Sequence, residues 1–132
     1  MKKILFAILS LFILSNAFAQ QKSSDVAVFT SDVVNMGKIP VGIPKSVTFT
    51  VKNVGKAPLI IETVTPTCGC TTKEFTQEPI MPGKMGKIVA TFNAASVQPF
   101  EKQLTVKFAG FKDMRMVTIK GEVVTVDEAK KL

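Results

Sequence analysis

The chain has 132 residues, with 17 Lys and Arg against 10 Asp and Glu, and its formal net charge is +7. It contains no histidine, tryptophan or tyrosine. Without histidine the usual Ser-His and Cys-His routes to an activated nucleophile are closed. Arg115 is the one arginine, and without Tyr or Trp the chain has little means to contact base edges or stack on bases. The composition therefore argues against an enzyme of these types and against a nucleic-acid-binding protein.

The N-terminus has the pattern of an export signal. Two lysines precede an apolar run at 4–14, which is too short to cross a hydrocarbon layer of about 30 Å as a helix. Ala17 and Ala19 then form a small-residue cleavage site. We expect residues 1–19 to be a signal peptide, cleaved before Gln20, and the mature chain to be periplasmic or secreted. No cysteine near the cut could carry a lipid, and no second apolar run predicts a membrane span.

The remaining chain has the length of one ordinary domain. Removing the two lysines of the signal lowers the formal net charge from +7 to +5. We expect a flexible segment at 20–25, a folded domain at 26–124 and a charged tail at 125–132. The lysines are spread along the whole chain, which is typical of a solvated surface and leaves only a weak attraction to anionic envelope polymers.

Apolar and polar residues alternate along most of the chain, which predicts β-strands with one buried face. The predicted strands, in chain order, are 26–29, 33–39, 46–52, 59–65, 86–92, 100–108 and 115–123. Turn residues separate them. Asn and Gly at 53–58 tolerate positive φ, and Pro82-Gly83 suits the centre of a type II turn.

About seven short, closely spaced strands favour an antiparallel β-sandwich of immunoglobulin-like type. A barrel is disfavoured, because the chain lacks a regular series of hairpins and the long connection at 71–83 suits a Greek-key crossing. The predicted core consists of inward-facing residues of the strands: Phe49, Val51, Ile61, Ile88, Phe92, Leu104, Val106, Val117 and Ile119.

The two cysteines form one close pair, Cys68-Gly69-Cys70, between Thr67 and Thr71. Outside the cytoplasm such a pair is a disulfide, a set of metal ligands or a reactive dithiol. The pair follows directly on the strand at 59–65, and sandwich domains commonly carry their sites on loops at strand ends. The loop from Thr67 to Thr71 is therefore the candidate functional site.

A disulfide between Cys68 and Cys70 needs a local turn. Residues i and i+2 of an extended strand have Cα atoms about 6.6 Å apart, which leaves the Cβ atoms too far apart. Gly69 can take a turn conformation and bring the sulfurs together. The closed ring would stabilise the fold by only about 1.6 kcal/mol, so a purely structural role is a poor explanation. We expect both sulfurs near the surface, where a disulfide would be comparatively reducible.

The metal hypothesis depends on softer ligands than zinc prefers. Without histidine, zinc would need two further ligands. The nearest carboxylates are those of Glu62, Glu74 and Glu78. Copper(I) fits better, because the thiolates of Cys68 and Cys70 could hold it almost alone, with Met81 or Met85 as a thioether. Methionines at those positions are nevertheless more typical of core or turn.

Several of these motifs together resemble a known family. They are Phe49, Asn53-Val54-Gly55, Pro58 to Ile61, Cys68-Gly69-Cys70-Thr71, Pro79, Pro82-Gly83, Gly86 to Phe92, Phe100, Lys102, Ile119 and Gly121. They resemble the bacterial "domain of unknown function 1573" family, itself similar to the immunoglobulin-like domains of the major sperm protein and ASH groups. The resemblance implies the sandwich fold and frequent export; it implies no substrate and no reaction.

Two functional hypotheses follow. The first is a non-catalytic cell-envelope module without a cofactor, which binds a protein or polymer through a sheet edge or its end loops. The alternative is a copper(I)-binding or thiol-redox protein that uses Cys68 and Cys70.

Overall fold

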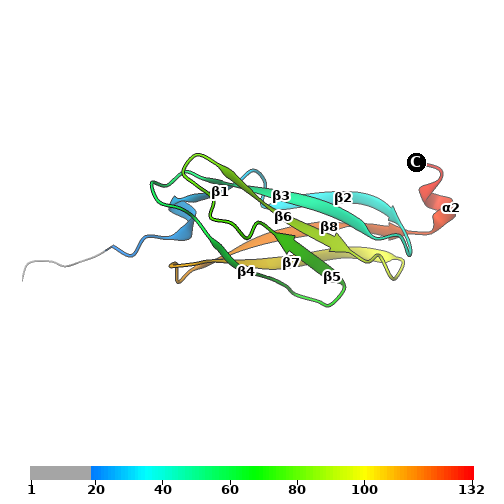
Figure 1. Ribbon diagram of the computed structural model, residues 1–132. Coiled ribbons are helices and arrows are strands. Elements are labelled where there is room, and N and C mark those ends of the chain that lie inside the picture. The colour runs from blue at the N-terminus through cyan, green and yellow to red at the C-terminus, as the bar shows by residue number, and fades with distance from the viewer. Residues whose placement is uncertain (1–18) are drawn as a thin grey trace, which may run out of the picture.

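The computed structural model describes residues 19–132, so the predicted signal peptide lies, apart from Ala19, outside the described residues. Two four-stranded sheets pack as a sandwich (Figure 1). The first sheet has the order β1 (Ala27–Phe29), β3 (Lys45–Asn53), β6 (Met85–Phe92), β5 (Thr71–Phe75). The second has the order β2 (Val33–Pro40), β8 (Met114–Val124), β7 (Gln98–Phe108), β4 (Ile61–Pro66). The predicted immunoglobulin-like fold class is confirmed.

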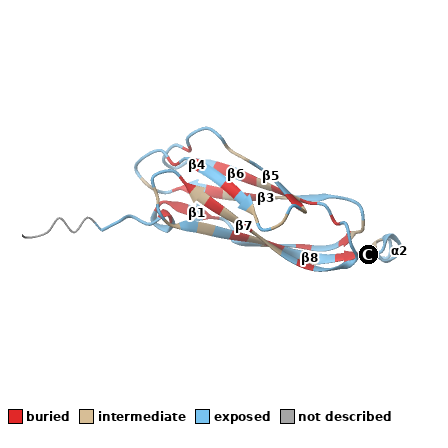
Figure 2. Cartoon of the chain, turned by 90° about the horizontal axis from the view of Figure 1, so that it is seen from below, coloured by how far each residue is buried: buried red, intermediate tan, exposed pale blue. Residues whose placement is uncertain are grey.

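The core lies between the sheets and comes from the alternation read in the sequence. Buried and exposed residues alternate along the strands (Figure 2). Alternate side chains of a strand point to opposite faces, so one face of each sheet is buried. All nine predicted core residues are buried, none more than 4% exposed. Each such Val, Leu, Ile or Phe side chain contributes about 1.5–3 kcal/mol on burial, and this burial holds the two layers together.

One strand pair is parallel, which the sequence analysis did not predict. Strand β2 runs parallel to β8, with Val33 opposite Thr118, while every other pair among the described residues is antiparallel. A bulge between Asn35 and Lys38 shifts the register of this pair. Gly37 lies in the bulge at φ +68°, a left-handed conformation that glycine adopts at little cost.

Gly121 on β8 lets this bulge approach the core. It faces inward opposite Phe100 of β7, whose ring stacks on Phe92 of the other sheet with centroids 4.1 Å apart. A Cβ at position 121 would lie 2.6 Å from the carbonyl oxygen of Gly37 and 2.9 Å from the Phe100 ring. Gly121 is therefore required by close packing.

Strand β5 corrects the prediction of a long turn at 71–83. The stretch Thr71–Phe75 pairs with β6, from Thr71 opposite Phe92 to Phe75 opposite Ile88. Its alternation is weak, because Phe75 is its only large apolar side chain and the charged Lys73 and Glu74 are exposed. The remainder of the predicted long turn is irregular, and the predicted type II turn is confirmed by Gly83 at φ +79°.

Asn53 differs from its predicted role as a positive-φ turn residue. It is completely buried, and neither it nor Gly55 has a positive φ. Its amide nitrogen donates to the carbonyl oxygens of Ala57 at 2.7 Å and Ile80 at 2.8 Å, and its side-chain oxygen accepts from the Gly55 amide at 2.9 Å. One side chain thus ties the β3–β4 turn to the segment before β6.

The N-terminal segment predicted to be flexible is anchored in the structure. Residues Ser23–Asp25 form a short 3-10 helix, η2, and Ser23 is completely buried. The Ser23 amide donates to both carboxylate oxygens of Asp113, at 3.0 and 3.1 Å, and its hydroxyl donates at 2.5 Å. These hydrogen bonds, first that of the hydroxyl and then those of the amide, lower the pKa of Asp113 below its ordinary value.

The predicted charged tail carries a short helix, α2 (Val126–Ala129). The Thr125 side chain caps it by accepting from the Glu128 amide at 3.3 Å. Glu128 also pairs with Lys38 of β2 at 2.9 Å, a hydrogen-bonded contact that raises the Lys38 pKa. No helix within residues 19–132 has the length and apolarity needed to cross a membrane.

Candidate functional site

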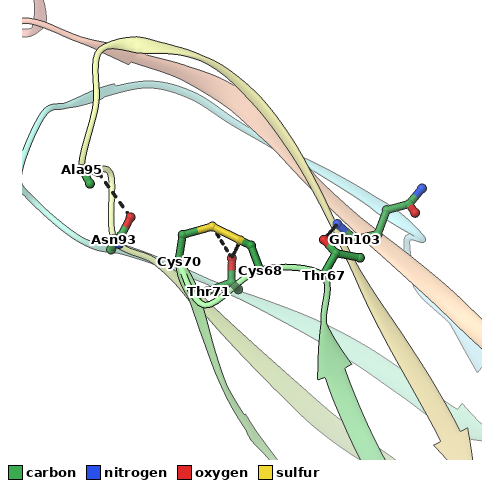
Figure 3. Close-up of a disulfide and its surroundings, with 7 residues drawn as sticks. All are labelled: Thr67, Cys68, Cys70, Thr71, Asn93, Ala95 and Gln103. Atoms are coloured by element: carbon green, nitrogen blue, oxygen red, sulfur yellow. Dashed lines mark hydrogen bonds between the residues drawn. A yellow bond between two sulfur atoms is a disulfide. The ribbon is translucent and has the colours of Figure 1, made fainter.

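The cysteine loop crosses from one sheet to the other, between the end of β4 and the start of β5 (Figure 3). Backbone bonds hold it at both sides. The Thr67 amide donates to the Gln103 carbonyl of β7 at 3.0 Å, and the Gln103 amide donates to the Thr67 hydroxyl at 3.4 Å. The Asn93 amide donates to the Cys70 carbonyl at 3.0 Å. The sandwich therefore fixes both ends of the loop.

Cys68 and Cys70 form a disulfide, one of the three states that the sequence left open. Their Cα atoms are 5.3 Å apart, closer than the roughly 6.6 Å of an extended strand, so the predicted local contraction is present. Gly69, however, does not have a left-handed φ, and a Cβ there would meet no atom within 4 Å. The contraction thus does not depend on glycine at position 69.

The two sulfur-bearing residues have different surroundings. Both cysteines are partly exposed, so the prediction of surface sulfurs holds in part. Cys70 packs against the hydrophobic core, whereas Cys68 is not part of that cluster. Above the ring, the exposed Gly69 leaves the space open.

Thr71 lies beneath the disulfide and contacts both of its sulfurs (Figure 3). Its hydroxyl oxygen is 3.8 Å from the Cys68 sulfur and 4.0 Å from the Cys70 sulfur. The residue is only 4% exposed. Because a disulfide sulfur carries no hydrogen, the hydroxyl is the donor in both contacts. Thr71 was included in the predicted loop, but its contact with both sulfurs requires the fold.

Ala94, next to the loop, is a site residue that the sequence did not indicate. It is completely buried and has φ +52°, a conformation that costs a non-glycine residue about 1 kcal/mol or more. Its carbonyl accepts from the Gly42 amide at 2.8 Å. The neighbouring Asn93 donates to Cys70, so this strained turn helps to position the disulfide.

The proposed thioether ligands of copper are not at the site. Met81 lies before β6 and Met85 is its first residue. Cys70 contacts Asn93, the residue that follows the last residue of β6. A strand of eight residues separates the two places by roughly 23 Å. Both methionines are exposed, so they are not core residues either. Copper(I) would also need both sulfurs as thiolates, which requires reduction of the disulfide first.

The proposed zinc ligands do not gather at the disulfide. Glu62 lies at the far end of β4 and pairs with Lys107 at 3.5 Å. Within residues 19–132, no three or more Cys, Asp or Glu residues are arranged to hold a metal ion.

The loop leads into an edge strand with free backbone groups. The bonds from Asn93 to Cys70 and from Thr76 to Lys87 show that the even-numbered residues of β5 face β6. Since bonding residues alternate along an antiparallel strand, the amide and carbonyl groups of Thr71, Lys73 and Phe75 point away from β6. The Thr71 amide donates to the Cys68 carbonyl at 3.5 Å, and the Phe75 carbonyl accepts from the Gln77 side chain at 3.3 Å. The open part of the edge is therefore centred on Lys73. The register of β5 contains no bulge and no proline.

The other three edge strands are protected. The carbonyl of Ala27 in β1 accepts from Arg115 at 2.9 Å. Strand β2 contains the bulge at Gly37 and ends in Pro40, and β4 has a register shift after Ile61 and ends in Pro66. Bulges and prolines are common means of preventing an edge from pairing with another chain. Strand β5 is thus the edge best suited to accept another strand.

The chain belongs to the family described as "Protein of unknown function (DUF1573)", whose model matches residues 27–123. This confirms the resemblance read from the motifs. No curated protein matches the chain in sequence.

Solved structures show the same fold. A protein of unknown function from Porphyromonas gingivalis W83 is 19% identical with a TM-score of 0.63, over 74% of this chain and 46% of that one. The VesB protease of Vibrio cholerae is 17% identical with a TM-score of 0.60, over 76% and 33%. The ASH/PapD-like domain 7 of human CEP192 is 9% identical with a TM-score of 0.61, over 86% and 96%. The chain thus spans less than half the length of the first two, and at these identities the likeness shows the fold alone.

Proposed function

We propose that this protein is an exported, non-catalytic module of the cell envelope that binds a protein partner by strand addition at β5. The observation that carries the proposal is the unbroken edge of β5, with both backbone groups of Lys73, the carbonyl of Thr71 and the amide of Phe75 directed outward. An extended segment of a partner can form main-chain hydrogen bonds with such an edge, and side-chain contacts then supply specificity.

The side chains of β5 indicate the chemistry of such a segment. Lys73 and Glu74 are exposed and lie on opposite faces of the strand. A second copy of this chain, paired antiparallel about Lys73, would place two lysines opposite each other, which is destabilising. A different protein, with an acidic residue opposite Lys73, satisfies this edge better than self-association does.

A proline at the edge tests the proposal. Because the Lys73 amide points away from β6, Lys73→Pro removes an outward donor and leaves the β5–β6 bonds in place. Envelope proteins retained by immobilised wild-type protein should be retained by Lys73→Ala and reduced at least about tenfold by Lys73→Pro. Hydrogen exchange of the purified complex should show protection at Lys73 and Phe75. Equal retention by the proline variant, with its fold verified by circular dichroism, would contradict strand addition.

A polymer partner, or binding by the end loops, gives a different result. The amount of partner retained would then be the same for Lys73→Pro as for wild-type protein, and the amides protected from hydrogen exchange would lie outside β5. Wild-type protein that captures polysaccharide and no protein would also reject the protein-partner proposal.

Export is a separate part of the proposal and rests on the apolar run at 4–14 and on Ala17 and Ala19. The mature chain should begin at Gln20 and occupy the periplasm or the medium. Intact mass measurement on fractionated cells tests this. A stable chain that keeps Met1 and stays in the membrane would contradict it.

A further inference from the structure

We infer that the Cys68–Cys70 disulfide is a site of thiol–disulfide exchange in the folded protein. The Thr71 hydroxyl donates a hydrogen bond to the sulfur that leaves. This activity is independent of strand addition at β5. The reacting partner is a thiol, or a dithiol such as the paired cysteines of an extracytoplasmic oxidoreductase. The inference rests on three features of the loop: its size, the different packing of the two cysteines and the hydroxyl beneath them.

The size of the ring argues against a purely structural bond. A disulfide between residues two apart constrains the unfolded chain very little. The loop is also held independently of the disulfide, by the backbone bonds of Thr67 to Gln103 and of Asn93 to Cys70. Opening the disulfide therefore leaves both anchors of the loop in place, and the fold does not oppose the reaction.

The packing of the two cysteines indicates which sulfur is attacked. Attack on a disulfide needs an approach to one sulfur on the side opposite the other. Both cysteines are partly exposed, but Cys70 packs against the core and Cys68 does not belong to that cluster. Gly69 is exposed and carries no side chain of its own to cover the ring. A thiolate from solution thus reaches the sulfur of Cys68 more readily than that of Cys70.

The electron and proton balance is complete with one dithiol. Its thiolate bonds to the Cys68 sulfur, and the electron pair of the broken bond leaves with the Cys70 sulfur as a thiolate. The second thiol of the dithiol, once deprotonated, attacks the first sulfur of the same dithiol, which is bonded to Cys68. This attack releases Cys68 as a thiolate. The dithiol becomes a disulfide, and its two protons end on Cys68 and Cys70.

Thr71 is placed to assist the first step. Its hydroxyl is 4.0 Å from the sulfur of Cys70, and the two sulfurs are its only hydrogen-bond partners among the described residues. The hydroxyl lies 3.8 Å from the Cys68 sulfur in the intact disulfide, and once the bond breaks it donates to the negative charge that develops on the leaving Cys70 sulfur. A leaving thiol that is stabilised in this way leaves faster. Thr71 is thus a positioning and donor residue and does not itself form a covalent bond.

Reduction kinetics test the site with dithiothreitol as the probe. Purified protein is incubated with dithiothreitol, and the free thiols are alkylated with iodoacetamide and counted by mass. The native protein should be reduced at a rate within about tenfold of its rate in denaturing urea. Reduction that proceeds only upon global unfolding, more than about a hundredfold slower in native buffer, would overturn the inference.

Variants separate the roles of the three residues. Thr71→Val should lower the native reduction rate about three- to tenfold, whereas Thr71→Ser should restore it, and the two should react equally fast in urea. Equal native rates for Val and Ser would overturn the role of the hydroxyl. Cys70→Ser, which leaves the Cys68 thiol, should alkylate faster than Cys68→Ser. The reverse order would overturn the assignment of the attacked sulfur, and both single variants remain informative if Thr71→Val does not fold.

Discussion

The two ends of the sandwich are closed in chemically opposite ways. At one end the buried Asn53 side chain ties the β3–β4 turn to the segment before β6 through three hydrogen bonds. At the other end a covalent bond joins Cys68 and Cys70. The covalent closure is the stronger bond but the weaker contribution to stability, because its ring is too small to restrict the unfolded chain. The amide, by contrast, satisfies buried groups that would be costly to leave without a partner.

The largest effect is expected from Asn53→Ala. The substitution leaves the carbonyl of Ala57 and the amide of Gly55 without this partner, and the carbonyl of Ile80 keeps only the Leu59 amide as donor. The free energy of unfolding should fall by about 3 kcal/mol. Urea denaturation measures it. Asn53→Asp is the matched control: it keeps an acceptor for Gly55 but loses both donors, so it should also destabilise. If Asn53→Ala lowers the free energy of unfolding by less than the double variant Cys68→Ser with Cys70→Ser does, the disulfide end contributes more to stability than the Asn53 end.

Gly121→Ala should follow, with a loss of about 2 kcal/mol. The added methyl group would meet the backbone carbonyl of Gly37, which the paired strand β2 holds in place, and the buried ring of Phe100. Gly69→Ala makes the same chemical change in the disulfide loop, where a Cβ meets no atom within 4 Å. It should change stability by less than about 0.5 kcal/mol. Equal losses at the two glycines would show that the disulfide loop is as tightly packed as the core.

The double substitution Cys68→Ser with Cys70→Ser should cost less than about 2 kcal/mol. The nine core residues that the sequence predicts remain buried without the disulfide, so the fold should persist. Circular dichroism and urea denaturation measure this. Global unfolding of the double variant would make the disulfide structural and would break the comparison between the two ends.

The smallest change in stability at neutral pH is expected at Asp113, whose charged carboxylate accepts hydrogen bonds from Ser23. Ser23 lowers the pKa of Asp113, so Asp113 binds its proton less readily in the folded than in the unfolded state. Its contribution is present above the ordinary carboxyl pKa and is lost as the pH falls through the lowered value. Between pH 5 and 2 the stability of wild-type protein should therefore fall more steeply than that of Asp113→Asn. Parallel curves from urea denaturation at each pH would contradict this.

Period-two alternation predicted much of the fold, because a buried strand face needs apolar residues at every second position. It located seven strands and every residue of the predicted core. It missed β5, where only Phe75 is large and apolar. An edge strand can form with few apolar side chains, so its alternation is weak. It also missed the parallel pairing of β2 with β8, since alternation fixes the face of a strand and not its neighbour.

The candidate site was predictable only as a segment. The spacing of Cys68 and Cys70 identified the loop and favoured a disulfide, but it left a metal site and a reactive dithiol open as alternatives. The contact of Thr71 with both sulfurs and the backbone strain at Ala94 depend on how distant segments meet. Asn53 was misread for the same reason: a turn propensity is local, whereas its partners at Ala57 and Ile80 come together only in the fold.

The parallel pair of β2 and β8 has a consequence for the order of folding. It joins almost the first strand of the domain to the last, so Val33 finds its partner Thr118 only after nearly the whole chain is available. Contacts between such distant residues slow folding, because a long loop must close before they form. A chain threaded through a membrane from its N-terminus would hold β2 unpaired until β8 emerged. If the chain is exported as proposed, this topology would delay completion of the second sheet until the end of transport, when the whole domain has reached one compartment.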